Sequence, residues 1–184
     1  MLEEVTIAGF GGQGVLSMGQ LMAYAGMLEG KTVSWIPSYG PEMRGGTANC
    51  GVTISYEKIS SPVVTEPNCA IIMNRPSLDK FEPKVKTGGL ILINSSLIDQ
   101  KVCRDDLTVY EIPANELANE LGNSKIANII LLGAYIELTK ALSIDSIIES
   151  LKKVLPERRH NLIPLNREAL EKGAAFIKRR SPNG

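Results

Sequence analysis

Cysteine and histidine are scarce in this sequence, and their scarcity excludes several kinds of site. The three cysteines, Cys50, Cys69 and Cys103, are far apart and odd in number, so no paired-cysteine metal motif is present and a disulfide framework is not expected. The single histidine, His160, lies in the polar stretch PERRHNL and is interpreted as a surface residue. We therefore predict a reducing, cytoplasmic setting, with no zinc or iron–sulfur ligation by this chain.

The sequence has a formal net charge of zero and contains no long apolar run. Twenty basic residues balance twenty acidic ones, so the electrostatic footprint typical of nucleic-acid binding is absent. The basic cluster at 178–180 is interpreted as a solvated helix terminus. The first residues lack the pattern of a signal peptide, and no apolar run approaches the roughly 20 residues of a membrane span. We expect neither nucleic acid nor membrane as a partner.

Motifs of self-contained catalysts are also absent. The sequence contains no GxSxG, HExxH or GxxxxGK[ST] pattern, so the residues for a hydrolase elbow, a zinc protease or a P-loop are missing. Its serines have no nearby base in the sequence. The chain is not expected to be a freestanding catalyst, and we predict no catalytic or metal-binding residue in it.

The pattern that is present predicts one α/β domain spanning residues 1–184. A short apolar strand at 5–8, a helix at 15–28 and a strand at 32–36 form a βαβ unit. The expected fold is three-layered and Rossmann-like, with a mostly parallel sheet and a helical C-terminal part. Further strands are predicted at 48–55, 69–74, 90–94 and 107–112, and helices at 113–121, at 125–142, after a cap at Ser143 and after a cap at Asn166.

The helix predicted at 125–142 contains IANIILLGAYIEL and is apolar nearly all round. Such a helix has more surface to bury than one face of a sheet covers. It is either a central core helix or partly an interface with another chain.

The first candidate site is GFGGQG at residues 9–14, which satisfies GxGxxG between a strand and a helix. Glycines there permit a tight turn and close approach of a phosphate to the backbone. A dinucleotide site also needs an acidic residue at the end of the second strand, but WIPS at 35–38 contains none. Three interpretations remain: an NAD or FAD site, an anion or cofactor-phosphate site, and a purely structural turn.

The second candidate site is the loop SYGPEMRGGTANC at residues 38–50. Arg44, beside Gly45 and Gly46, suits a phosphate or carboxylate, because a guanidinium and accessible amides can converge on an anion. Alternatively, Glu42 and Arg44 pair with each other or with carbonyls of the core and hold the loop. Both candidate loops leave the carboxyl ends of strands, so we expect them to share one edge of the sheet.

Three motifs in this order resemble the gamma subunit of the 2-oxoacid:ferredoxin oxidoreductases: GFGGQGV, then SYGPEMRGGTANC followed by VTIS and ISSPVV, and then KIANIILLGAYIEL. The resemblance covers about residues 4–175. The form GPEMRGGTANC is more similar to the 2-oxoglutarate member than to the pyruvate or 2-oxoisovalerate members, and the small subunit of the indolepyruvate enzyme is a further relative.

The resemblance implies an enzyme complex that oxidatively decarboxylates a 2-oxoacid, forms its acyl-CoA and reduces ferredoxin. Thiamine diphosphate, magnesium and iron–sulfur clusters would be held by other subunits, and this chain alone would bind none of them. The implied partners are the alpha, beta and delta (ferredoxin-like) subunits, with coenzyme A as a further ligand. Its apolar helix and its two loops would then be assembly surfaces.

The motif match assigns eleven binding positions, facing either coenzyme A or other subunits. Two hypotheses of other classes stay open: a freestanding Rossmann-type dinucleotide-binding protein, and a scaffold without a ligand. The assigned positions are Gly9, Gly11, Gly12, Gln13 and Gly14 in the first loop, and Tyr39, Gly40, Glu42, Arg44, Gly45 and Gly46 in the second.

Overall fold

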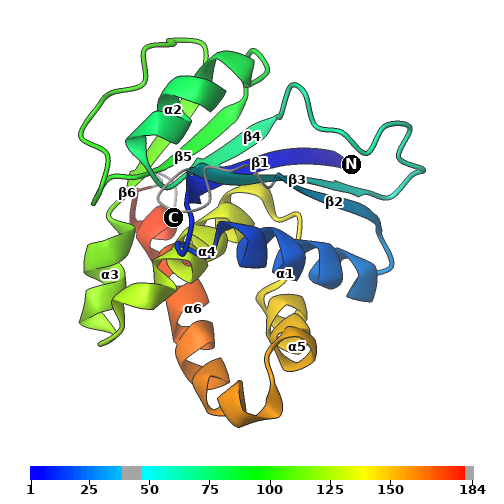
Figure 1. Cartoon of the computed structure of the whole chain (residues 1–184), viewed down its shortest axis with the longest axis vertical. Coiled ribbons are helices and arrows are strands. Elements are labelled where there is room, and N and C mark those ends of the chain that lie inside the picture. Colours follow the sequence, from blue (N-terminus) through cyan, green and yellow to red (C-terminus); the bar gives the residue numbers. More distant parts are fainter. Residues whose placement is uncertain (39–46, 181–184) are drawn as a thin grey trace.

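The computed structural model describes residues 1–38 and 47–180. All described strands lie in the first two thirds of the chain, with helices between some of them, and helices make up the rest (Figure 1). The elements are β1 (Leu2–Phe10), α1 (Val15–Leu28), β2 (Thr32–Ser38), β3 (Thr47–Ser55), β4 (Cys69–Ile72), α2 (Arg75–Phe81), η2 (Glu82–Lys84), β5 (Leu90–Asn94), β6 (Thr108–Ile112), α3 (Ala114–Glu120), η3 (Ser124–Ile126), α4 (Ala127–Thr139), α5 (Ile144–Val154), η4 (Glu157–Leu162) and α6 (Ile163–Arg180).

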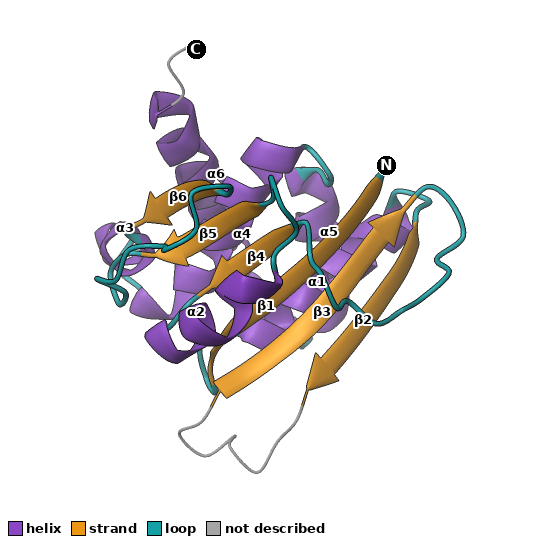
Figure 2. Ribbon diagram, turned by 90° about the horizontal axis from the view of Figure 1, so that it is seen from above, coloured by secondary structure: helices purple, strands orange, loops and turns teal. Residues whose placement is uncertain are grey.

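The strands form one sheet in the order β2-β3-β1-β4-β5-β6. β1, β4, β5 and β6 pair in parallel, whereas β3 is antiparallel to both of its neighbours, so β2 again runs in the direction of β1 (Figure 2). The predicted mostly parallel α/β sheet is confirmed. It differs from the expected βαβ unit in one respect, because β3 is inserted between β1 and β2.

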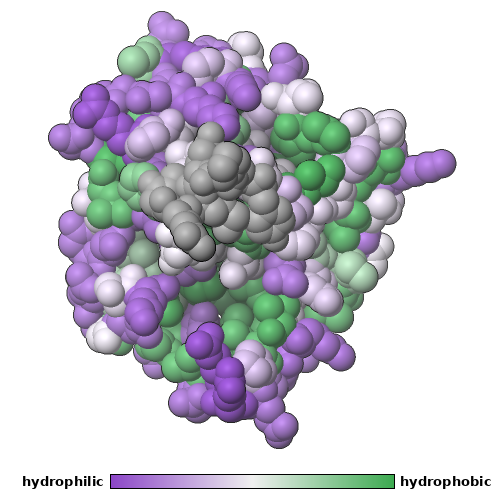
Figure 3. Space-filling view, viewed as in Figure 1, coloured by the Kyte–Doolittle hydropathy of each residue, from purple (hydrophilic) through white to green (hydrophobic). Residues whose placement is uncertain are grey.

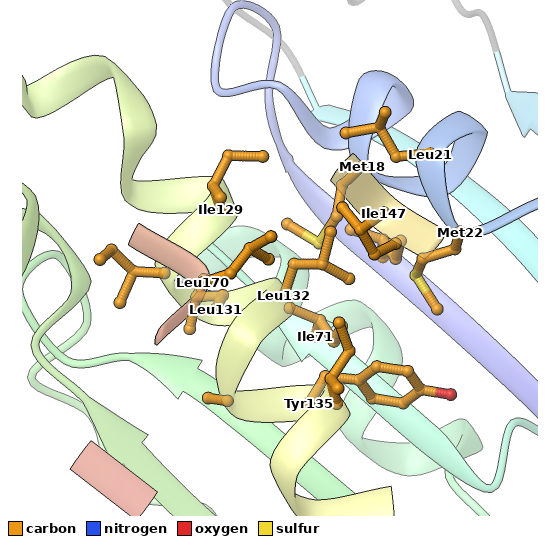
Figure 4. Close-up of a cluster of buried hydrophobic side chains, with 14 of the residues drawn as sticks. Met18, Leu21, Met22, Ile71, Ile129, Leu131, Leu132, Tyr135, Ile147 and Leu170 are labelled. Carbon is orange, nitrogen blue, oxygen red and sulfur yellow. The ribbon is translucent and has the colours of Figure 1, made fainter. Parts of the chain in front are cut away.

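Helices cover the two faces of the sheet unequally. α1, α4, α5 and α6 lie on one side, while α2 lies on the other, over the β4–β5 half (Figure 1). The larger core fills the first side, where Met18 and Met22 of α1 meet Leu132 and Tyr135 of α4 and Ile71 of β4 (Figure 4). The predicted third layer is therefore thin, since α2 is the helix that covers the second face.

α4 is a core helix. Every residue from Ala127 to Ile136 is buried within this chain, so over this stretch the first of the two predicted alternatives, a central core helix, is confirmed. The helix is also shorter than predicted, because η3 precedes it and Lys140 ends it with φ of 53°. The apolar surface all round α4 is covered by the sheet on one side and by α6 on the other.

Two glycines let α4 and α6 cross closely. A Cβ atom at Gly133 would lie 2.0 Å from the carbonyl oxygen of Leu170, and one at Gly173 would lie 1.9 Å from that of Ile130. Only glycine fits at these positions, because real Cβ atoms do not approach backbone atoms so closely.

Two of the predicted helix starts have different outcomes. Ser143 caps α5, since its Oγ accepts a hydrogen bond of 3.1 Å from the amide of Ser146. The cap predicted at Asn166 is wrong, because α6 begins at Ile163 and the Asn166 side chain donates to the carbonyl of Leu162. Sequence reasoning also missed α2, although Asn74 caps it and a proline stands in its first turn.

Candidate functional site

The sheet has a switch point between β1 and β4. These neighbouring parallel strands lead into helices on opposite faces, β1 into α1 and β4 into α2 (Figure 1). Such a point leaves a crevice at the carboxyl ends of the two strands, which is the usual ligand edge of α/β folds. The GFGGQG turn (residues 9–14) lies at this edge.

Gln13 holds the GFGGQG turn in place. Its side-chain Oε1 accepts a hydrogen bond of 2.6 Å from the backbone amide of Phe10. The backbone amide of Gln13 donates a hydrogen bond of 3.2 Å to the carbonyl of Phe10. Its Nε2 reaches across to the carbonyl of Met73, at the end of β4, over 3.4 Å. One side chain therefore joins the ends of the two strands that flank the crevice.

Gly9, Gly12 and Gly14 are needed for different reasons. Gly12 and Gly14 have φ of 89° and 74°, a backbone region that favours glycine. At Gly9 a Cβ atom would lie 2.6 Å from Oε1 of Gln13. At Gly14 it would lie 2.3 Å from Nδ2 of Asn128, whereas nothing lies within 4 Å of such an atom at Gly12. Of these three glycines, Gly12 is the one whose surface stays open.

Asn128 joins α4 to the turn. Its Nδ2 donates a hydrogen bond of 3.2 Å to the carbonyl oxygen of Gly14, the residue that precedes α1. Asn128 is buried, and a buried amide needs such partners. Sequence reasoning assigned Asn128 no role, although it is a polar residue inside an otherwise apolar helix and that contrast was the available signal.

α1 begins without a side-chain cap and without an acidic residue in its first turn. The first amides of a helix have no partner within it and carry a partial positive charge. A hollow of roughly 270 Å³ lies against this helix start and is lined by Phe10, Gly11, Gly12, Gly14, Val15, Leu16, Ser17 and Ala48. This arrangement suits a negatively charged or hydrogen-bonding group.

A second, smaller hollow lies on the other side of the turn. Its volume is roughly 190 Å³, and Gly12 and Gln13 line it together with Met73, which directly follows β4, and residues from α3, η3 and α4. Lys125 brings a cationic side chain to it. The residues that sequence reasoning missed here are Met73, Asn115, Ser124, Lys125, Ala127 and Asn128.

The structure places the first predicted loop at this edge, and Gly9, Gly11, Gly12, Gln13 and Gly14 form one turn. Six predicted positions lie outside the described residues: Tyr39, Gly40, Glu42, Arg44, Gly45 and Gly46. The strands that flank them end at the same edge, since Ser38 pairs with Asn49 and Thr47 pairs with Phe10. The expectation of a shared edge is thereby met for the flanking residues.

The buried cysteines are not suited to nucleophilic chemistry. Burial raises the pKa of the Cys50 thiol to about 12 and that of Cys69 well above its ordinary value, and a thiol must ionise to react. Cys103 is exposed and free. Within residues 1–38 and 47–180, no three His, Cys, Asp or Glu side chains are grouped so that they could hold a metal ion.

No helix in the described part of the chain is long and apolar enough to cross a membrane.

The family model for pyruvate ferredoxin/flavodoxin oxidoreductase matches residues 4–176 of the chain. The chain belongs to this family. The match extends from β1 into α6 and therefore includes the GFGGQG turn, the crevice and α4.

The curated relatives carry different substrate names. The chain is 40% identical over 177 residues to ketoisovalerate oxidoreductase subunit VorA of Methanothermobacter marburgensis, covering 96% of this chain and 37% of the relative. It is 34% identical over 160 residues to 2-oxoglutarate synthase subunit KorC of Methanocaldococcus jannaschii, covering 85% of this chain and 86% of the relative. The chain thus spans little more than a third of the ketoisovalerate relative.

Solved structures agree on the fold. The gamma subunit of keto/oxoacid ferredoxin oxidoreductase from Geobacter sulfurreducens superposes with a TM-score of 0.82 at 28% identity, covering 96% of this chain and 99% of that one. A chain of the 2-oxoglutarate:ferredoxin oxidoreductase from Magnetococcus marinus has a TM-score of 0.87 at 24% identity, and this chain covers 32% of it. The resemblance to gamma subunits is confirmed.

Proposed function

We propose that this chain is the gamma subunit of a multi-subunit 2-oxoacid:ferredoxin oxidoreductase. The complex decarboxylates a 2-oxoacid oxidatively, transfers the acyl group to coenzyme A and passes the electrons to ferredoxin. The observation that carries the proposal is the family match over residues 4–176, together with the 99% coverage of a gamma subunit of known structure.

The chain's role in this complex is structural and positioning. The described residues contain no metal-ligand group, and the two buried cysteines are poor nucleophiles. As the family resemblance implies, thiamine diphosphate, magnesium and the iron–sulfur clusters would be held by the other subunits. The crevice edge, with its open Gly12 and the uncapped start of α1, faces either coenzyme A or these subunits.

Two of the candidate 2-oxoacids are each favoured by a different observation. Ketoisovalerate is favoured by the higher identity of 40% to the VorA subunit. 2-Oxoglutarate is favoured by the KorC subunit, which this chain matches along 86% of its length, and by the form GPEMRGGTANC. The preference for 2-oxoglutarate therefore stays a prediction.

A freestanding dinucleotide-binding protein is the competing function, and the sheet argues against it. In a Rossmann site the acidic residue that holds the ribose ends the strand beside β1. Here β3 occupies that place and runs antiparallel to β1, while β2 ends in Pro37 and Ser38. Neither strand brings a carboxylate to the GFGGQG turn.

Purification of the chain from its native cells tests the proposal. We expect the other subunits to co-purify and the complex to reduce ferredoxin in the presence of coenzyme A. Ketoisovalerate, 2-oxoglutarate, pyruvate and indolepyruvate assayed in parallel identify the substrate. A monomeric chain whose melting temperature rises strongly with NAD or FAD would contradict the proposal.

A further inference from the structure

An apolar groove opens beside the crevice, between α1, α4 and the α5–α6 pair. Its volume is roughly 240 Å³. Apolar side chains gather between α1, α5 and α6 on this face, with hydrophilic side chains around them (Figure 3). The apolar lining consists of Leu21, Ile126, Ile129, Leu151, Val154 and Leu155.

Two cationic side chains, Lys125 and Arg159, line the same groove. Both residues are exposed, and neither forms an ion pair within residues 1–38 and 47–180. Some other cations of the helical part have acidic partners: Arg167 pairs with Asp145 at 2.9 Å and Lys172 with Glu120 at 2.6 Å. The groove thus combines apolar walls with uncompensated positive charge.

The corner between α5 and α6 fixes one wall of the groove. The ring Nε2 of His160 lies 3.0 Å from the carbonyl oxygen of Leu155, and the amide of Arg159 donates to the carbonyl of Pro156 over 2.7 Å. Arg159 therefore projects from a turn that is tied at both ends. The backbone that carries this cation is thus held in place.

The groove continues the crevice edge. Lys125 and Asn128 line both the groove and the small hollow beside Gly12, and Ser17 lines both the groove and the hollow at the start of α1. A chain that covers the GFGGQG turn can therefore reach the groove without crossing another element.

We infer that this groove docks an apolar side chain of another subunit, carried by a segment with a carboxylate next to it. Charge complementarity selects the acidic flank, because Lys125 and Arg159 have no acidic partner in the described part of this chain. The volume of the groove favours a single side chain over a whole small-molecule ligand, since ligand pockets have volumes of about 300 Å³ or more. Buried apolar anchors with charged rims are a common form of interface.

This inference rests on the proposed function, because it needs a complex in which another subunit is present. Charge reversal tests it without disturbing the core. The double variant Lys125→Glu/Arg159→Glu should bind a complex that lacks this chain about tenfold more weakly than the wild type, or worse. The matched control is Lys153→Glu/Arg179→Glu, since both of these residues are exposed, form no ion pair in the described residues and lie outside the groove. It should bind like the wild type.

A photo-cross-linking residue at Arg159 then identifies the occupant in the intact complex. The expected product joins this chain to an Asp- or Glu-containing apolar peptide of another subunit. Equal binding by both double variants overturns the inference, as does a cross-link to a second copy of this chain or an intact complex without any cross-link. If wild-type chain fails to join any complex, the proposed function fails instead, and the two failures are thus distinguishable.

Discussion

Glycine serves opposite purposes in two regions of this molecule, the α4–α6 crossing and the GFGGQG turn. At the crossing, Gly133 and Gly173 allow two helices to touch backbone to backbone in the interior. In the turn, Gly12 has a positive φ that favours glycine, and open space around it. At the crossing, this chain's own atoms occupy the space of the missing side chains, whereas at Gly12, which lies on the predicted ligand edge, that space is open.

The largest effect is expected at the crossing. In Gly173→Ala the new Cβ atom would lie 1.9 Å from the carbonyl oxygen of Ile130, so α6 has to move away from α4. We expect a loss of about 3 kcal/mol in the free energy of unfolding, measured by urea denaturation. Unchanged stability would mean that the helices do not cross this closely.

The next largest loss of stability is expected at Gly14, which combines close packing with a positive φ. Gly14→Ala adds a Cβ atom 2.3 Å from Nδ2 of Asn128 at a φ of 74°, and should cost about 2 kcal/mol. Removing the amide with Asn128→Ala in the same chain should recover about 1 kcal/mol of it. Strictly additive losses in this double-mutant cycle would show that the contact is absent.

Sequence patterns revealed the local features of both regions but not their surroundings. The strand–glycine–helix pattern located the GFGGQG turn, because a tight turn between a strand and a helix needs glycines at fixed positions in the sequence. The burial of α4 was undecided, because an all-round apolar helix does not indicate what covers it. The insertion of β3 between β1 and β2 and the contact between Asn128 and Gly14 depend on residues distant in sequence. Asn166 was misread as a cap because α6 begins three residues earlier, at Ile163.

A smaller loss of stability is expected at Gln13. Gln13→Ala removes the side-chain hydrogen bonds to the amide of Phe10 and the carbonyl of Met73, and should cost about 1 to 2 kcal/mol. Because the turn then loses its link to β4, coenzyme A-dependent activity of the complex should fall as well. A folded variant of normal stability would show that this side chain does not hold the turn.

The smallest loss of stability is expected at Gly12. In Gly12→Ala only the φ of 89° opposes the new methyl group, since no atom lies within 4 Å, and about 1 kcal/mol should be lost. Assembly with the other subunits should suffer more than stability, because the methyl group fills the open surface. Normal assembly at this position would place the partner elsewhere.

Hydrogen exchange, compared between the chain alone and the chain in its complex, tests the central claim most directly. The claim is that the crevice edge is covered by other subunits or by their coenzyme. It predicts that the amides of the turn and the start of α1 (residues 11–17) and of η4 (157–162) exchange more slowly in the complex. The loop at 56–61, next to the opposite end of β1, should exchange equally in both. Protection at 56–61 with none at 11–17 would contradict the account.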